Sequence, residues 1–230
     1  MTEGRGDMTG HDEHSPATPA QGAGEFWDDL YGAGERIWSG EPNAALVRET
    51  ADLAPGSALD LGCGEGADAI WLARRGWRVT AVDVSRIALE RGAEQARRAG
   101  VADRIEWLRH DLAESFPGGS FDLVSAHFLH APSPVELPRE RILRDAAAAV
   151  SPGGVLLVVG HAGPPPWADD HGHDDHPPLP TSAEVLGSLG LPEQEWEPLV
   201  SGEYRRDATG PDGQRAVLED AVLKLRRLPG

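Results

Sequence analysis

Short apolar runs alternate with amphipathic stretches through the middle of this 230-residue chain. Apolar runs of this length predict buried β-strands. They cover residues 58–61, 78–84, 105–110, 121–126 and 155–160. The stretches between them repeat their apolar residues with helical spacing, at about 66–75, 86–99 and 138–150. Strands that alternate with helices in this way imply right-handed crossovers and a parallel sheet, so the pattern predicts a doubly wound, Rossmann-like α/β fold.

The C-terminal part of the chain has a different pattern. Two extended segments, 196–206 and 216–225, flank the sequence Gly-Pro-Asp-Gly at 210–213, which is typical of a turn. Such an arrangement predicts an antiparallel hairpin. Added to one edge of the parallel strands, the hairpin would complete a mostly parallel, seven-stranded sheet.

The segments outside this core differ from it in composition. Residues 1–24 are polar and lack periodic hydrophobic positions, so we expect a disordered tail. Residues 161–180 are rich in His, Asp and Pro and predict a long loop, which in such folds is often a lid or a substrate-binding element. Residues 25–230 are predicted to form one domain.

Residues 25–53 precede the first predicted strand and carry two helical patterns. Glu25–Tyr31 holds four large apolar residues, and Asn43 is a suitable N-cap for a helix from Ala44 to Leu53. We expect this segment to be a helical cover over the domain.

The most informative motif follows the first predicted strand. It reads Asp-Leu-Gly-Cys-Gly-Glu-Gly over residues 60–66, and the second strand ends on Asp83. Glycines allow the backbone to approach a ligand closely, and a carboxylate at the next strand end can accept both hydroxyls of a ribose. Because doubly wound folds bind ligands beyond the carboxyl ends of their strands, the motif predicts a nucleotide-type site.

The charge of this turn bears on which ligand it holds. Asp60, Glu65 and Asp68 surround it. They would repel a pyrophosphate placed on the following helix N-terminus, and they favour a cationic ligand with an ammonium and a sulfonium. The glycine spacing is also GxGxG, whereas dinucleotide sites use GxGxxG. A nicotinamide-dependent dehydrogenase is therefore the less favoured alternative.

The acid and glycines at 60–66 resemble the (D/E)xGxGxG motif of the class I S-adenosylmethionine-dependent methyltransferases. The resemblance implies S-adenosyl-L-methionine as cofactor and a small-molecule acceptor of its methyl group. It implies that Asp60 acts near the amino group of the methionine moiety and that Asp111 faces the adenine amine. The full set of cofactor contacts that we expect is Asp60, Leu61, Gly62, Cys63, Gly64, Asp83, Val84, Asp111, Leu112 and His127.

Three further sequence segments resemble one particular branch of this family. IWSGEPN at 37–43, LDLGCGEGADAIWLA at 59–73 and SAHFLH at 125–130 are similar to the small bacterial branch that includes tellurite-resistance and thiopurine methyltransferases. In that branch an N-terminal helix covers the cofactor, which residues 25–53 would do here. The implied acceptors are thiols, metalloid oxyanions or amphipathic metabolites.

His127 and His130 follow the fourth predicted strand and are the candidate catalytic residues. In the family, residues leaving this strand line the cavity between the methyl group and the acceptor. A histidine can accept a proton near neutral pH, although ordinary partly buried histidines are the alternative. We expect further acceptor contacts, with plain packing as the alternative for the aromatic residues, from Trp27, Tyr31, Trp38, His161 and Trp167.

A second class of function remains open from the residues. Imidazole and carboxylate groups in the 161–180 loop can together hold zinc, nickel or copper, although its prolines favour a lid or a pocket wall. We assign no metal ligands. The alternative to an enzyme is a non-catalytic S-adenosylmethionine-binding or metal-binding protein on the same fold.

Composition limits the partners. Lys plus Arg number 21 and Asp plus Glu number 38, a net charge of −17, which disfavours nucleic acids and anionic membranes. The only cysteine, Cys63, excludes an intrachain disulfide. No apolar run reaches the roughly 18 residues of a membrane span. We therefore expect a cytoplasmic monomer or homodimer.

Overall fold

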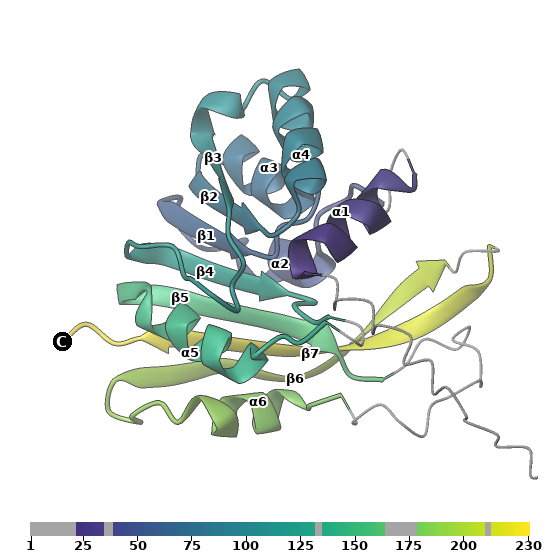
Figure 1. The fold of residues 1–230 in the computed structure, drawn as a ribbon. Helices are drawn as coiled ribbons and strands as arrows, with labels where there is room; N and C mark the ends of the chain where they lie inside the picture. The colour runs from purple at the N-terminus through teal and green to yellow at the C-terminus, as the bar shows by residue number, and fades with distance from the viewer. Residues whose placement is uncertain (1–21, 35–38, 132–134, 164–178, 210–212) are drawn as a thin grey trace, which may run out of the picture.

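The computed structural model describes residues 22–34, 39–131, 135–163, 179–209 and 213–230. Within them a seven-stranded sheet has the order β3-β2-β1-β4-β5-β7-β6 (Figure 1). The strands are β1 (Ser57–Leu61), β2 (Arg78–Asp83), β3 (Ile105–Arg109), β4 (Phe121–His127), β5 (Val150–His161), β6 (Trp196–Thr209) and β7 (Arg215–Arg227). β1 to β5 pair in parallel, and β7 pairs antiparallel with both β5 and β6. The predicted fold class is confirmed.

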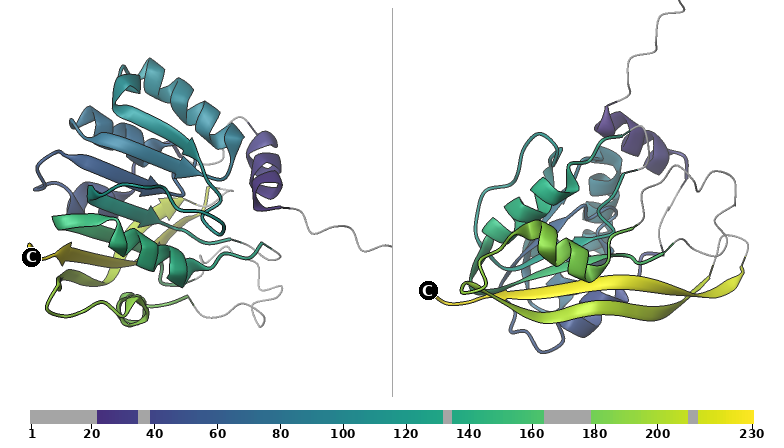
Figure 2. Two further views of the ribbon diagram at one scale, coloured as in Figure 1. Left: turned by 60° about the vertical axis from the view of Figure 1, so that its left-hand side comes forward. Right: turned by 90° about the horizontal axis from the view of Figure 1, so that it is seen from below.

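Helices cover both faces of the sheet. They are α1 (Ala23–Gly32), α2 (Ala44–Glu49), α3 (Ala67–Arg74), α4 (Arg86–Arg98), α5 (Arg139–Ala148) and α6 (Ser182–Leu189), with the 3₁₀ turn η1 at Ala102–Arg104. One apolar core joins the sheet to α5 and α6, and a second joins it to α2, α3 and α4 (Figures 1 and 2). None of the helices in the described ranges is long and apolar enough to cross a membrane.

β5 shows why the central strands appear in the amino-acid sequence as continuous apolar runs. Successive residues of a strand point to opposite faces. Leu156 and Val158 lie in the core beneath α5 and α6, whereas Leu157 and Val159 lie in the core beneath α2 and α3. Because both faces are covered, every one of these positions is apolar.

The order of the strands determines where a ligand can bind. The chain proceeds from β1 to β2 and β3 on one side, and then returns to β4 and β5 on the other side of β1. Crevices form at such a switch point, beyond the carboxyl ends of the strands. The ends of β1, β2 and β4 are therefore the place to look for a site.

Two predicted boundaries were wrong. The fifth strand begins at Val150 and not at residue 155, and its register shifts before Leu123 pairs with Val155. A Cβ on Gly154 would lie 2.9 to 3.0 Å from three backbone oxygens, so only glycine fits this bulge. α2 also ends early, since Thr50 has left the helical conformation.

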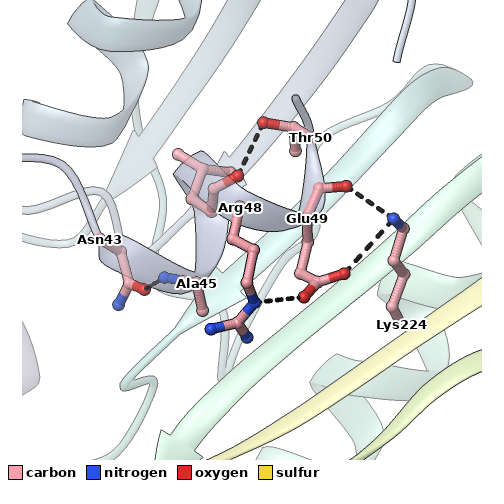
Figure 3. A network of polar contacts seen from close by, with 7 residues as sticks. Asn43, Ala45, Arg48, Glu49, Thr50 and Lys224 are labelled. Atoms are coloured by element: carbon pink, nitrogen blue, oxygen red, sulfur yellow. Dashed lines mark hydrogen bonds and ion pairs between the residues drawn. The ribbon is translucent and has the colours of Figure 1, made fainter. Parts of the chain in front are cut away.

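α2 is anchored to the sheet by buried polar contacts (Figure 3). Asn43 caps the helix by accepting a hydrogen bond of 2.8 Å from the N–H of Ala45. At the other end, Lys224 Nζ of β7 donates to the carbonyl of Glu49 at 2.6 Å and lies 3.5 Å from its carboxylate. Arg48 Nε donates to the other carboxylate oxygen at 2.7 Å. Both ends of this short helix are therefore held in place.

α1 lies beyond the ends of the parallel strands, next to α4 (Figure 2, left). Asp28 accepts a hydrogen bond from the hydroxyl of Ser85 at 2.6 Å and from the N–H of Ile87 at 3.1 Å. Burial raises the pKa of Asp28, but these hydrogen bonds outweigh it and the net pKa is lowered. A carboxylate at a helix N-terminus is stabilised by the helix dipole, so Asp28 attaches α1 to the first turn of α4.

Candidate active site

A tight turn with three glycines follows β1. Gly62, Gly64 and Gly66 have φ values of +68°, +52° and +79°, a region that side chains disfavour. A Cβ on Gly62 would lie 2.8 Å from Leu129, and one on Gly66 would lie 2.2 Å from the ring of Trp107. The close contacts and positive φ values therefore favour glycine at these positions of the turn at the carboxyl end of β1.

Asp83 faces this turn from the end of β2. One carboxylate oxygen accepts the N–H of Gly64 at 2.8 Å and the other accepts the N–H of Ser85 at 2.9 Å. Burial raises the pKa of Asp83, opposed in part by these hydrogen bonds. Each oxygen keeps a second lone pair, so the carboxylate is oriented and still able to accept hydrogen bonds from a ligand.

Asp60 is buried at the end of β1, with 2 % of its surface exposed. Its Oδ1 accepts the hydroxyl of Ser125 at 3.1 Å, while Oδ2 has no partner among the described residues. Burial, followed by the charge of Asp68, raises the pKa of Asp60 to about 7. A buried carboxylate oxygen without a donor is costly, so this position favours a cationic hydrogen-bond donor.

His127 ends β4 beside the same carboxylates. Its side chain is 6 % exposed, and Nδ1 lies 2.7 Å from Oδ2 of Asp68. The other oxygen of Asp68 accepts the N–H of Asn43 at 2.6 Å. In the part of the chain that the structure describes, His127 Nε2 has no partner. β1, α3 and β4 thus bring Asp60, Asp68 and His127 together, and two of these side chains each have a buried polar atom without a partner among the described residues.

Asp60, Asp68 and His127 could hold a cation together. One oxygen or nitrogen of each lies within 4.8 Å of the others. Carboxylate and imidazole ligands suit zinc-like ions, and this set was not assigned to metal from the sequence. Both oxygens of Asp68 are already hydrogen-bonded, however, which leaves Asp60 as the carboxylate with a vacant oxygen. That favours an ammonium group over a metal ion.

A second group of polar and aromatic side chains lies where β4 and β5 end. His161 and Asp220 are directly opposite each other in the β5–β7 pair, with His161 Nδ1 3.6 Å from Asp220 Oδ1. Arg206 donates to the other oxygen of Asp220 at 2.5 Å. The ring centroid of Phe128, whose φ is +50°, lies 4.3 Å from that of His161, and the ring centroid of His130 lies 5.7 Å from that of His161.

The two candidate catalytic histidines therefore differ. His127 is enclosed next to the cofactor-side carboxylates, whereas His130 is an exposed residue beside His161. Burial of the His130 ring, followed by the charge of His161, lowers the pKa of His130. His130 is thus predominantly neutral near pH 7 and available as a proton acceptor.

The remaining predicted cofactor residues contribute in different ways. The side chains of Leu61 and Leu112 lie in the apolar core, which leaves their backbone for a ligand. Asp111 accepts the N–H of Ala113 at 2.8 Å and so shapes the turn after β3. Val84 accepts a hydrogen bond from Arg109 through its carbonyl.

Cys63 lies within the glycine turn and has no chemical role in this geometry. Its N–H donates to the carbonyl of Val82 at 2.9 Å, which ties the turn to β2. Burial, followed by the charges of Asp83 and Asp60, raises the pKa of the thiol well above its usual range. The thiolate is therefore a minor species at neutral pH.

The predicted acceptor aromatics are only partly described. Trp27 and Tyr31 lie on α1 with ring centroids 6.2 Å apart, and Tyr31 is 4 % exposed. Trp38 and Trp167 lie outside the described residues, as do the tail up to residue 21 and most of the His/Asp/Pro-rich loop. Their predicted roles stay predictions.

Sequence reasoning missed three residues of the site. Asp68 was counted only for its charge, and Asp220 and Arg206 were not considered. Asp68 and His127 are 59 residues apart, and no spacing rule connects them. The position of Asp68 in the first turn of α3, facing the strand ends, was the one available signal.

The order of the sheet, the glycine turn and the acids at the strand ends define the class I methyltransferase fold. Residues 58–154 match a family described as a methyltransferase domain, and the resemblance seen in the sequence is confirmed. Its narrower placement in the tellurite-resistance and thiopurine branch stays a prediction.

Two curated relatives show how far the similarity extends. Ribosomal RNA small subunit methyltransferase C of Alcanivorax borkumensis is 35% identical over 120 residues, which is 50% of this chain and 36% of that protein. Methyltransferase GfsG of Streptomyces halstedii is 32% identical over 142 residues, 58% of this chain and 48% of that protein. The chain thus matches between about a third and a half of the length of these relatives.

Solved structures agree over more of the chain. One, described as "Conversion of a Disulfide Bond into a Thioacetal Group during Echinomycin Biosynthesis", has a TM-score of 0.68 at 24% identity and covers 89% of this chain and 91% of its own. TehB from Haemophilus influenzae has a TM-score of 0.60 at 18% identity, over 87% of this chain and 66% of its own. At these identities the comparisons establish the fold.

Proposed function

We propose that this protein transfers a methyl group from S-adenosyl-L-methionine to a small-molecule acceptor. The observation that carries the proposal is the buried, unpaired Oδ2 of Asp60 beside the bare backbone of the glycine turn. An acidic, desolvated oxygen of this kind fits the ammonium of the methionine moiety and repels a pyrophosphate. The methyltransferase family match over residues 58–154 supports the same cofactor.

The residues at the strand ends would each bind a different part of the cofactor. Asp60 would accept from the ammonium and Asp83 from the ribose hydroxyls, with the backbone of Gly62 and Gly64 alongside. Asp111 would lie toward the adenine amine. When bound, the cofactor supplies a methyl group on a sulfonium, which is already electrophilic. The task left to the protein is to align an acceptor with that methyl group.

The acceptor would bind where β4 and β5 end. Phe128 and His161 offer ring faces there, and His130 offers a neutral imidazole that can take a proton from an acceptor oxygen or nitrogen. The positive φ of Phe128 is a strained conformation of the kind that clusters at functional sites. Trp27 and Tyr31 of α1 would close the same region, with residues 25–53 as the cover of a single domain.

Small acceptors are favoured over nucleic acids. 27-O-demethylrifamycin SV methyltransferase of Amycolatopsis mediterranei is 33% identical over 141 residues, 58% of this chain and 48% of that protein. Relatives named for ribosomal RNA also match, at 35% identity. The net charge of −17 opposes binding to a phosphate backbone, and this charge is the reason for our choice.

Calorimetric titration of the purified protein with S-adenosyl-L-methionine and S-adenosyl-L-homocysteine tests the cofactor. We expect micromolar affinity, about −8 kcal/mol, that falls strongly in Asp83→Ala. Formation of S-adenosylhomocysteine with phenolic, thiol and amine acceptors then tests turnover. Binding without turnover of any acceptor would favour a non-catalytic binding protein. Binding of nicotinamide dinucleotide in place of the methionine cofactor would contradict the proposal.

A further inference from the structure

The imidazole of His127 is held in a single orientation. Its Nδ1 lies 2.7 Å from Oδ2 of Asp68, and a carboxylate only accepts, so Nδ1 carries the hydrogen. The ring is almost fully enclosed, with 6 % of the side chain exposed. Its Nε2 is the only polar atom of the ring left for another group, and it has no partner among the described residues.

Asp68 is fixed in turn. Its Oδ1 accepts the N–H of Asn43 at 2.6 Å, so both of its oxygens are engaged. Asn43 is the N-cap of α2, and α2 is held on β7 through Lys224 and Glu49 (Figure 3). This continuous chain of contacts means that Asp68 cannot turn toward a ligand without breaking two partly buried hydrogen bonds. Asp68 is therefore a positioning residue for His127.

The surroundings of His127 favour the imidazolium. Burial alone lowers the pKa of His127, but the hydrogen bond and charge of Asp68, with the charge of Asp60, outweigh it and raise the pKa. With a hydrogen on both nitrogens, Nε2 is a charged donor. Asp60 has a ligand atom within 4.8 Å of one of His127, and its Oδ2 is an acceptor without a partner among the described residues. One unpaired donor and one unpaired acceptor in the same buried place match a ligand that carries both complementary groups.

We propose that His127, positioned by Asp68, binds the carboxylate of the methionine moiety, while Asp60 takes the ammonium of the same amino acid. The inference rests on the proposed function and specifies how that site recognises its cofactor. It also separates the two roles predicted for His127. A general base needs a lone pair at Nε2, whereas binding a carboxylate needs a hydrogen on that atom. His127 would therefore bind the cofactor, and His130 would be the residue that accepts a proton from the acceptor.

Two ligands that differ only in the carboxylate test the assignment. S-adenosyl-L-homocysteine carries it, and S-adenosyl-3-thiopropylamine keeps the ammonium but lacks the carboxylate. A hydrogen bond between charged groups contributes about tenfold to a hundredfold in affinity. In calorimetric titration the wild-type protein should therefore prefer S-adenosylhomocysteine by a factor of about ten to a hundred, a comparison that needs no variant.

Variants of His127 and Asp68 test whether these residues cause the preference for the ligand that carries the carboxylate. His127→Asn keeps a donor at the position of Nδ1 and removes Nε2, so it should bind S-adenosylhomocysteine about tenfold to a hundredfold more weakly and leave the thiopropylamine analogue unchanged. His127→Gln restores a donor near Nε2 and should recover part of the loss. Asp68→Asn should act in the same direction as His127→Asn. His110→Asn, at the end of β3, is the matched histidine control.

The outcomes separate this inference from the proposed function. If wild-type protein binds both ligands equally well, or if His127→Asn weakens both by the same factor, His127 does not bind the carboxylate. If His127→Asn leaves S-adenosylhomocysteine binding intact but abolishes turnover, His127 is the base instead. If wild-type protein binds neither ligand, the proposed function itself fails. Circular dichroism of each variant confirms that the fold is retained.

Discussion

The affinity of the cofactor should depend on pH through Asp60. Burial and the charge of Asp68 raise the pKa of Asp60 to about 7 in the ligand-free protein. The ammonium of the cofactor requires the ionised carboxylate, so binding below that pKa must first remove a proton. On the acid side, affinity for S-adenosylhomocysteine should therefore fall about tenfold for each pH unit below about 7.

The magnitude follows from the size of the shift. Two pH units below the pKa of Asp60, at about pH 5, the loss reaches roughly a hundredfold, or about 3 kcal/mol. Titrations in two buffers with different ionisation enthalpies should show that a proton is released on binding between about pH 5 and 7. The pKa of His127 is raised, and its imidazolium becomes more populated as the pH falls, so the titration of His127 does not oppose the trend.

Asp60→Asn is the control, because the amide cannot ionise. It should bind S-adenosylhomocysteine more weakly at every pH. Any dependence of affinity on pH that remains in this variant would come from Asp83, the other buried acid of the site, whose pKa is also raised by burial. An affinity in the wild-type protein that stays flat from about pH 5 to 8 would refute the reasoning. Proton uptake on binding in this range would refute it as well.

Three further predictions concern the glycine turn and its supports. Gly66→Ala places a Cβ 2.2 Å from Trp107 at a φ of +79°, and should cost about 2 kcal/mol or more in urea unfolding; an unchanged midpoint would contradict the close contact. Lys224→Met leaves Glu49 buried beside one cation fewer and should lower the free energy of unfolding by about 1–3 kcal/mol, whereas a neutral effect would show that α2 is not held by this pair. Cys63 should react slowly with a thiol reagent at about pH 8, where a free cysteine is partly ionised; rapid labelling would contradict its raised pKa.

The secondary structure was largely predictable because its signals are local. The alternation of apolar runs and helical patterns and the cap at Asn43 each depend on a few consecutive residues, and the structure confirms them. The start of β5 was not predictable in this way. Whether Val150 pairs with Phe121 or ends in a turn depends on the partner strand, and a local pattern contains no information about that partner.

The same distinction applies to the candidate site. The amino-acid sequence alone determined the glycine turn and its acids, because the conformational freedom of glycine and the strand-end position of Asp60 act within seven neighbouring residues. Only the tertiary structure decided what His127 contacts. Asp68 lies 59 residues from it, and the parallel pairing of β1 with β4 brings α3 and the end of β4 together. Burial there, which no sequence pattern measures, leaves Nε2 of His127 and Oδ2 of Asp60 without partners among the described residues, and our proposal for the cofactor rests on these two atoms.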